Sequence, residues 1–271
     1  MGNDSAGWDD LPAAVRELVE ARAGGVLGAE VSGEGMNSSL RLVVDTPGGR
    51  LFLKGVGPGG RGGWKLDQAA ALAPYVGEVS PPLLWRVSAE GWDILAWPAL
   101  PGRPWADQTP GSPDLPKMLA VLRVVGEMAA PGFVTVTAGD HWARYADDPG
   151  VFGGDALVHR DMNPCNFVVG DDRAWLVDWG WAVRGPAWLT AAEFVLSLIE
   201  AEWLPGDAER FVGALPAWRA ADPRHVDVFA RANVAMWDEV LGDYPGWPRD
   251  WRAGKAREWA EHRAGLARLR A

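Results

Sequence analysis

The kind of secondary structure that the sequence predicts changes once along the chain, and this change limits the folds available to it. Residues 29–100 contain short apolar segments separated by Gly, Pro and Asn turns, which is typical of antiparallel strands. From residue 117 onward the apolar residues recur mostly at helical spacing. Strands followed by helices predict an α+β fold with two lobes. We expect a small antiparallel β-rich lobe over residues 1–100 and a mostly helical lobe over residues 101–271.

Periodicity and turn residues locate the individual elements within each lobe. The first lobe should contain helices at 11–24 and 64–76, and strands within 29–46, 48–56 and 81–100. A segment rich in Pro and Gly over residues 101–116 predicts the connection between the lobes. The second lobe should contain a helix at 117–130, short strands within 156–182, and further helices at 189–203, 207–220, 222–241 and 254–269.

Charge and cysteine content narrow the classes of partner and location. The formal net charge of -10 argues against nucleic acid, whose phosphates are bound through basic surfaces. The single cysteine, Cys165, excludes an intramolecular disulfide framework and fits a reducing compartment. The start of the chain lacks the apolar core of a secretion signal, and no apolar run is long enough to span a bilayer. We expect a cytoplasmic monomer or homodimer that binds neither nucleic acid nor membrane.

The strongest chemical signal is the segment His159–Asn166, which has the pattern H-x-D-x-x-x-x-N and is followed by Asp178 after an apolar stretch. Phosphoryl transfer needs a carboxylate that accepts the proton of the attacking hydroxyl. It also needs oxygen ligands for the magnesium ions that bridge the nucleotide phosphates. Asp161 is the candidate base, and Asn166 and Asp178 are the candidate metal ligands. His159 is expected to support the loop as a structural residue.

This segment resembles the catalytic loop and metal-binding strand of the aminoglycoside phosphotransferase family, the small-molecule branch of the protein-kinase-like fold. The similarity lies in the H-x-D-x-x-x-x-N pattern together with Asp178-Trp179-Gly180 and the apolar segment that follows. Protein kinases have Phe after this Asp, and the sequence also lacks their A-P-E segment. The resemblance implies a kinase-like two-lobe fold, ATP or GTP as phosphate donor, Mg²⁺ as cofactor, and a small-molecule hydroxyl as acceptor.

The resemblance also implies where the nucleotide binds in the first lobe. Lys54 ends the apolar run of a predicted strand, where its ammonium group can pair with the α- and β-phosphates. The turn before this strand occupies the position of the phosphate-covering hairpin, and a later strand that leads into the lobe connection offers backbone groups to adenine. The residues expected in these roles are Gly35, Ser38 and Ser39 for phosphate, and Ala96 and Trp97 for adenine.

Two positions depart from the family pattern. The family has a Glu on the helix after the lysine strand, which holds the lysine by an ion pair. This sequence has Asp67 and Gln68 there, so Lys54 is expected to pair with Asp67 or to be held in another way. Many relatives also have an Asp on the helix that follows the metal-binding strand, where this sequence has Thr190 and then Glu193. Thr190 is interpreted as the cap of that helix.

The acceptor is expected to lie between the catalytic loop and the C-terminal helices. Acidic residues on these helices could receive a cationic acceptor, and tryptophans could stack against a sugar or a base. The alternative for each residue is a solvated helix face or ordinary packing. The candidates are Glu202, Trp203, Asp238 and Glu239.

The leading hypothesis is transfer of the ATP γ-phosphate to a hydroxyl of an antibiotic of aminoglycoside, nucleoside or peptide type, as a resistance activity. The first alternative is a metabolic kinase that acts on choline, homoserine or a thiosugar. The second is a non-catalytic pseudokinase that binds a partner or ligand, which the absent helix Glu favours. The presence of Lys54, Asp161, Asn166 and Asp178 in the order of the family argues against the pseudokinase.

Overall fold

The computed structural model describes residues 6–32, 39–60, 62–243 and 251–270, and the chain forms two compact units. The first unit runs to Pro101 and also includes the returning segment Val177–Gly180, and the second contains the rest of the chain. An antiparallel sheet dominates the first unit and helices dominate the second, so the predicted α+β fold is confirmed. Each unit is described by itself below.

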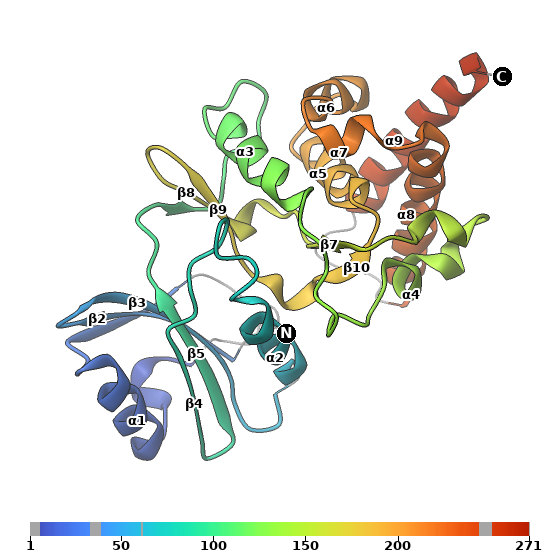
Figure 1. Cartoon of the computed structure of the whole chain (residues 1–271). Coiled ribbons are helices and arrows are strands. Elements are labelled where there is room, and N and C mark those ends of the chain that lie inside the picture. Colours follow the sequence, from blue (N-terminus) through green and yellow to red (C-terminus); the bar gives the residue numbers. More distant parts are fainter. Residues whose placement is uncertain (1–5, 33–38, 61, 244–250, 271) are drawn as a thin grey trace. The chain divides into compact units, whose positions relative to one another are not determined.

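The first unit is built on a five-stranded antiparallel sheet with the strand order β1-β2-β3-β5-β4 (Figure 1). Its strands are β1 (Gly28–Val31), β2 (Leu40–Thr46), β3 (Gly49–Val56), β4 (Trp85–Ala89) and β5 (Trp92–Pro98). The helical elements are a short 3₁₀ turn (Trp8–Asp10), α1 (Ala13–Ala23) and α2 (Gly63–Leu72). Helix α1 ends where the sequence predicts, because Gly24 adopts the left-handed conformation of a helix C-cap with φ 77°.

The two faces of this sheet are covered by different helices. Val15 and Val19 of α1 share a buried apolar cluster with Leu53 and Ile94 of the sheet. Leu95 is the next residue of β5, and it belongs instead to the cluster of α2, because successive residues of a strand point to opposite faces. Lys54 lies directly across from Leu95 in the β3–β5 register, so its side chain projects on the face that α2 covers.

The second unit combines short strands with most of the helices. Its strands are β6 (Arg103–Pro104), β7 (Ala156–Val158), β8 (Phe167–Val169), β9 (Ala174–Leu176) and β10 (Val183–Gly185), and they form a β6-β8-β9 sheet and a β10-β7 pair. Its helices are α3 (Leu115–Val125), α4 (Ala138–Trp142), α5 (Trp188–Glu200), α6 (Pro205–Val212), α7 (Pro216–Arg219), α8 (Pro223–Asp243) and α9 (Trp251–Arg270). Four 3₁₀ turns complete it, at Ala143–Tyr145, Pro149–Phe152, Pro164–Asn166 and Trp179–Trp181, the last of which begins in the first unit.

The single helix predicted over 207–220 is wrong, because the structure has two helices there. The first, α6, ends at Val212, and α7 begins at Pro216. Proline lacks the backbone N–H that an α-helix interior needs, but it suits the first position of a new helix.

Aromatic rings fill the core between α4, α8 and α9. The ring of Phe229 contacts Trp142 at a centroid distance of 5.4 Å and Trp259 at 5.9 Å, both edge to face. Trp188 of α5 contacts the same ring at 6.0 Å. Edge-to-face pairs of this kind add to the free energy of apolar burial. Part of the high tryptophan content of the chain, 17 residues, thus serves the core of this unit.

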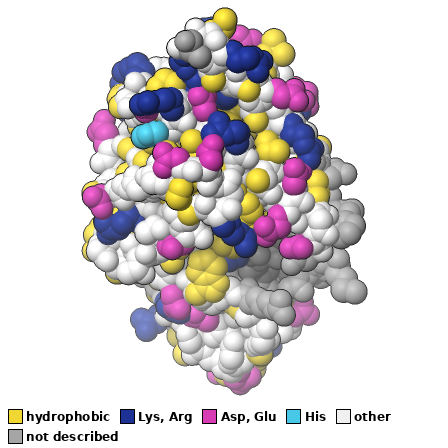
Figure 2. Space-filling model, turned by 90° about the vertical axis from the view of Figure 1, so that its right-hand side faces the viewer, with side chains coloured by type: hydrophobic (Ala, Val, Ile, Leu, Met, Phe, Trp, Pro, Cys, Tyr) yellow, Lys and Arg dark blue, Asp and Glu magenta, His cyan; other side chains and the backbone are white. Residues whose placement is uncertain are grey.

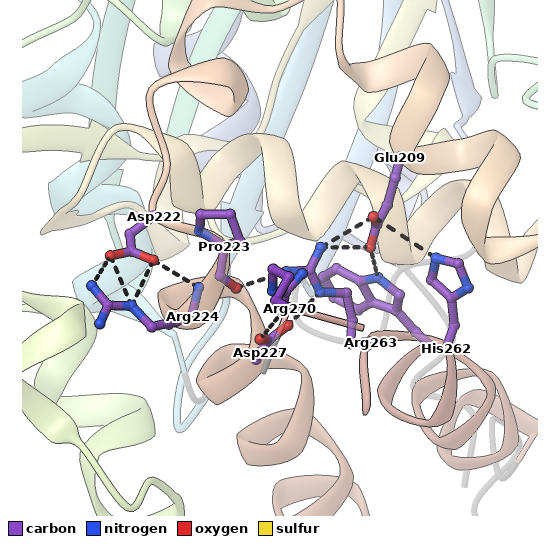
Figure 3. Close-up of polar contacts among 9 residues, drawn as sticks. Glu209, Asp222, Pro223, Arg224, Asp227, His262, Arg263 and Arg270 are labelled. Carbon is purple, nitrogen blue, oxygen red and sulfur yellow. Dashed lines mark hydrogen bonds and ion pairs between the residues drawn. The ribbon is translucent and has the colours of Figure 1, made fainter. Parts of the chain in front are cut away.

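A buried network of charged side chains joins α6, α8 and α9 (Figure 3). Arg263 of α9 donates to Asp227 of α8 at 2.6 Å and to Glu209 of α6 at 3.1 Å. Its remaining Nη atom donates to the backbone carbonyl of Pro223 at 2.7 Å, and Trp259 Nε1 also donates to Glu209. One guanidinium group of α9 therefore bonds both α6 and α8, and Arg270 of α9 adds a second ion pair to Asp227.

Within the described ranges, no helix is both long enough and apolar enough to cross a membrane.

Candidate functional site

The catalytic loop predicted from the H-x-D-x-x-x-x-N pattern leaves β7 and ends in the 3₁₀ turn Pro164–Asn166 before β8. Asp161 is half-buried on this loop, and Nδ2 of Asn163 donates to its Oδ1. Arg160 has φ 70°, a left-handed conformation that costs a non-glycine residue about 1–2 kcal/mol. Backbone strain of this kind is concentrated at functional sites, where the surrounding structure maintains it. His159 is fully buried, as expected of a structural residue.

Asn166 closes the loop and presents an oxygen suited to a hard cation. Its Nδ2 donates to the backbone carbonyl of Asp161 at 3.0 Å, and only 6% of the residue is exposed. Because the amide nitrogen is used in this bond, the orientation of the carbonyl oxygen Oδ1 is fixed. Among the described residues the one hydrogen bond to Oδ1 is a long contact from Cys165 Sγ at 3.9 Å. The amide oxygen is thus suited to accept Mg²⁺, which prefers oxygen ligands.

In the first unit, Lys54 forms an ion pair with Asp178, with 2.7 Å between Nζ and Oδ1. Of the two alternatives for Lys54, pairing with Asp67 is not the one observed, because Asp67 of α2 pairs with Arg86 of β4 at 2.6 Å. The neighbouring Gln68 donates a hydrogen bond from its side-chain amide to the backbone carbonyl of Trp179 at 3.5 Å. The lysine and a predicted metal ligand therefore hold each other.

Asp178 follows the end of β9 and has φ 66°. The left-handed conformation is tolerated better by Asp than by most other residues, but it still carries strain. Its ion pair with Lys54 holds the carboxylate in place on the returning segment of the first unit. A carboxylate fixed in this way fits the predicted role of a magnesium ligand. In the part of the chain that the structure describes, no group of three or more His, Cys, Asp or Glu residues is placed to hold a metal ion.

The structure describes only some of the other residues that were predicted to contact the nucleotide. Gly35 and Ser38 lie outside the described residues. Ser39 is described, and its carbonyl accepts a hydrogen bond from Ala6 at 2.9 Å. The carbonyl of Ala96 accepts from the N–H of Leu84 at 2.9 Å, so it is already used within the sheet. Adenine recognition at Ala96 and Trp97 stays a prediction.

A polar stripe on the mostly apolar helix α5 supports the catalytic loop, and its residues were not among the predicted site residues. The stripe consists of Glu193, Ser197 and Glu200, which share one helical face by their spacing of four and three residues. Glu193 accepts a hydrogen bond from the backbone N–H of Arg160. Ser197 Oγ lies 2.7 Å from the carbonyl of Met162, within the same loop. The sequence does contain a signal for this stripe, because three polar residues recur at helical spacing in a segment that is mostly apolar.

The interpretation of Thr190 as a helix cap is wrong. Helix α5 begins at Trp188 with Ala187 at the cap position, so Thr190 lies inside the first turn. Its side chain is buried, and its hydroxyl has no hydrogen-bond partner among the described residues. Glu193, one turn further along, supplies the acidic group that contacts the loop.

Burial makes Glu193 and its neighbours unusual acids and bases. Desolvation raises the pKa of Glu193 to about 8, and the charge of Arg160 opposes this shift without cancelling it. Burial likewise lowers the pKa of Arg160 and lowers that of His141 to about 4. The Arg160 guanidinium lies 5.5 Å from the ring of Trp142 and 5.2 Å from that of Trp181. At neutral pH Glu193 is therefore mostly protonated beside a loop that carries the candidate base.

This shifted pKa predicts how stability changes with pH. A carboxyl whose folded-state pKa of about 8 exceeds its ordinary value of 4.5 stabilises the fold fully below 4.5 and loses that contribution as pH rises through 8. Glu193→Gln keeps the shape but cannot ionise. The stability of the natural protein relative to this variant should fall between about pH 4.5 and pH 8 and then level off. Thermal unfolding of both proteins across this range measures it, and a constant difference in melting temperature would contradict it.

The four predicted acceptor residues all have partners within the second unit. Glu202 pairs with Lys255 at 3.2 Å, Asp238 pairs with Arg257, and Glu239 pairs with Arg144. Trp203 donates from Nε1 to the carbonyl of Gln108 at 2.7 Å, and its ring contacts Phe211 at 5.2 Å. Figure 2 shows acidic and basic side chains interspersed on the face that it draws. These acids are therefore matched by basic partners, and their role in acceptor binding stays a prediction.

One pocket of about 450 Å³ lies in the second unit. Its lining includes Glu202 and Trp203, together with Leu204 and Phe211, but neither Asp238 nor Glu239. No residue of the catalytic loop lines it. The pocket is consequently separate from the proton acceptor that the reaction would need, and we assign it no role in the chemistry.

No family model and no curated protein sequence matches the chain. Solved structures with the same fold do match it over nearly their full length. The aminoglycoside phosphotransferase APH(4)-Ia, in a ternary complex with AMP-PNP and hygromycin B, has a TM-score of 0.64 and 16% identity. The match covers 92% of this chain and 98% of that chain.

A second similar structure is the choline kinase LicA from Streptococcus pneumoniae, which has also been solved in complex with AMP. It has a TM-score of 0.59 and 14% identity, and the match covers 93% of this chain and 100% of that chain. Structural similarity at sequence identities this low establishes the fold alone. The predicted resemblance to aminoglycoside phosphotransferases is confirmed at that level, and the chain has the kinase-like fold of small-molecule phosphotransferases.

Proposed function

We propose that this protein transfers the γ-phosphate of ATP to a hydroxyl group of a small molecule. The observation that carries the proposal is the arrangement of the catalytic loop. Asp161 receives a side-chain hydrogen bond from Asn163, and Asn166 bonds back to the carbonyl of Asp161. A carboxylate held in this way is a suitable general base, because its position and rotation are set before the acceptor binds. A predicted cytoplasmic location also fits a reaction that consumes ATP.

In the proposed reaction, Asp161 accepts the proton of the acceptor hydroxyl as its oxygen attacks the γ-phosphorus. The new bond joins that oxygen to phosphorus, the bond from phosphorus to the β–γ bridging oxygen breaks, and ADP leaves. Lys54 would pair with the nucleotide phosphates, and Asp178 would return it to a defined position when the nucleotide departs. Asn166 and Asp178 are the candidates to hold Mg²⁺, which supplies positive charge to the phosphates.

For the acceptor we propose an antibiotic that carries a free hydroxyl group, on the basis of the resemblance to the aminoglycoside phosphotransferases. The pairing of Glu202, Asp238 and Glu239 with basic side chains bears on its charge. A polycationic aminoglycoside would have to displace Lys255, Arg257 and Arg144 to reach these carboxylates. An acceptor with less positive charge, such as a nucleoside or peptide antibiotic, would not.

An acceptor panel tests the proposal directly. The purified protein is incubated with ATP, Mg²⁺ and one candidate at a time, and ADP release is measured against a sample without acceptor. The panel contains aminoglycoside, nucleoside and peptide antibiotics together with choline, homoserine and a thiosugar. We expect stimulation by at least one antibiotic. Stimulation by a metabolite alone would replace the antibiotic acceptor by a metabolic one, and nucleotide binding without any turnover would support a pseudokinase.

A further inference from the structure

Arg252, the second residue of α9, reaches the catalytic loop through the side chain of Asn163. Its Nη2 donates to Oδ1 of Asn163, and Nδ2 of Asn163 donates to Oδ1 of Asp161. The oxygen of an asparagine amide only accepts hydrogen bonds and its nitrogen only donates, while a guanidinium only donates. Arg252 therefore selects one of the two orientations of the Asn163 amide, the one that turns its nitrogen toward Asp161.

Arg252 is itself held firmly. It forms an ion pair with Glu200 at 3.1 Å, in which 13% of the arginine side chain and 9% of the glutamate side chain are exposed. Its guanidinium carbon also lies 5.7 Å from the ring of Trp237 and 5.6 Å from that of Trp251. Ion pairs with low exposure and cation–π contacts restrict an arginine far more than an exposed pair does. The guanidinium plane is thus anchored before it contacts the loop.

Helix α5 brings this anchor to the same face that supports the rest of the loop. Glu200 is the last member of the polar stripe, whose other members, Glu193 and Ser197, contact Arg160 and Met162. The stripe therefore supports Arg160 and Met162 directly and Asn163 through Arg252. The residues on both sides of Asp161 are thus supported by one face of α5, directly on one side and through Arg252 of α9 on the other.

We propose that Arg252 is a positioning residue that sets the rotation of the Asp161 carboxylate through Asn163. The proposal rests on the proposed function of Asp161 as the base. In this arrangement Oδ1 of Asp161 is engaged by the amide of Asn163, which fixes the direction in which Oδ2 points. Helix α9 acts on the reaction without contacting the reacting atoms. Asn163 is one of the unspecified positions of the H-x-D-x-x-x-x-N pattern, so the motif alone does not contain this relay.

The test compares Arg252→Lys with Asn163→Ala and with the double variant. Nη2 of Arg252 contacts both Glu200 and Asn163. Lysine keeps the charge that Glu200 needs, but its nitrogen ends a chain that is one bond shorter than the path to Nη2, and it lacks the planar group that directs the two N–H bonds of Nη2. Each single variant should lower kcat about 10-fold to 100-fold, the effect expected when a reacting group loses its orientation, with little change in the KM for ATP. The double variant should be no slower than the slower single variant, because the two residues act in series.

Arg268→Gln is the matched control, since Arg268 lies on the same helix with an exposed side chain and should leave kcat unchanged. Defects that multiply in the double variant would overturn the relay, as would an Arg252→Lys protein with the natural kcat. A general loss of folding would appear instead as a lower melting temperature and a raised KM for ATP.

A measurement without turnover separates this proposal from the proposed function. The side-chain amide protons of Asn163, followed by NMR with ¹⁵N labelling, should exchange with solvent faster in Arg252→Lys than in the natural protein and the Arg268→Gln control. Unchanged exchange overturns the relay. A natural protein that phosphorylates no acceptor would sink the proposed function, while the exchange rates would still decide whether Arg252 orients Asn163.

Discussion

Asp161→Asn should lower turnover about 10²-fold to 10⁴-fold, the range expected for the loss of a general base, while the fold is retained. Asparagine has nearly the same shape as aspartate, and its amide oxygen can still accept the hydrogen bond that Asn163 donates to Oδ1. It cannot take the proton of the acceptor hydroxyl. The defect should therefore appear in kcat, with the melting temperature close to that of the natural protein.

ADP release with a saturating acceptor measures this effect. Asp171→Asn makes the same chemical change at an exposed position in the turn between β8 and β9, and it should leave turnover unchanged. Equal turnover in Asp161→Asn and the natural protein would refute Asp161 as the base. Nucleotide affinity, measured separately by calorimetry, should be similar in all three proteins because Asp161 is not expected to hold the nucleotide.

Arg263→Ala should destabilise the second unit by about 3–5 kcal/mol, which is the cost of removing one partner from a buried ion pair. The side chain of Arg263 is 6% exposed and satisfies Asp227, Glu209 and the carbonyl of Pro223 at once (Figure 3). Without it, Asp227 would keep its pair with Arg270, and Glu209 would keep the hydrogen bond from Trp259, but both carboxylates would remain poorly solvated with fewer partners. The loss is large because the charges stay buried, even though an intact buried pair contributes little by itself.

The chain has two compact units, so a lower melting temperature would not by itself show that the second unit has lost stability. Hydrogen exchange of the α6, α8 and α9 amides reports it directly, and these amides should exchange faster in Arg263→Ala. Arg224→Ala is the control, because the Arg224 side chain is 83% exposed in its pair with Asp222 and should matter little. If both variants exchanged alike, the network would have no special role in stability.

Much of the fold was predictable because its signals are local. Strand alternation, turn residues and helical periodicity located the five-stranded sheet and most of the helices. The prediction failed at 207–220, where one helix was expected although Pro216, which lacks the N–H of a helix interior, begins a new helix. Thr190 failed for a similar reason. A threonine before an apolar helix can be a cap, but the helix begins two residues earlier, at Trp188.

The candidate site was only partly predictable, because its chemistry is local but its supports are not. The spacing within His159–Asn166 is readable in the sequence since a single loop carries both Asp161 and Asn166. The partner of Lys54 could not be predicted from the sequence. The family pattern indicated a residue of α2, but the observed partner is Asp178 on the returning segment. The acidic residues on the C-terminal helices were visible, but the basic side chains that pair with them come from other elements.

The candidate residues in the segment His159–Asn166 and Asp178, like the order of strands and helices, could be predicted from local sequence. These features are recognised from residue types and spacing over a few positions, and recognising them does not require knowledge of how the chain packs. Three further contacts became visible in the folded chain: Asp178 pairs with Lys54, Glu193 and Ser197 of α5 contact the loop, and Arg252 bonds Asn163, which is 89 residues away in the sequence. Contacts at such separations depend on how helices pack, and helix packing is set by the whole core rather than by any one segment.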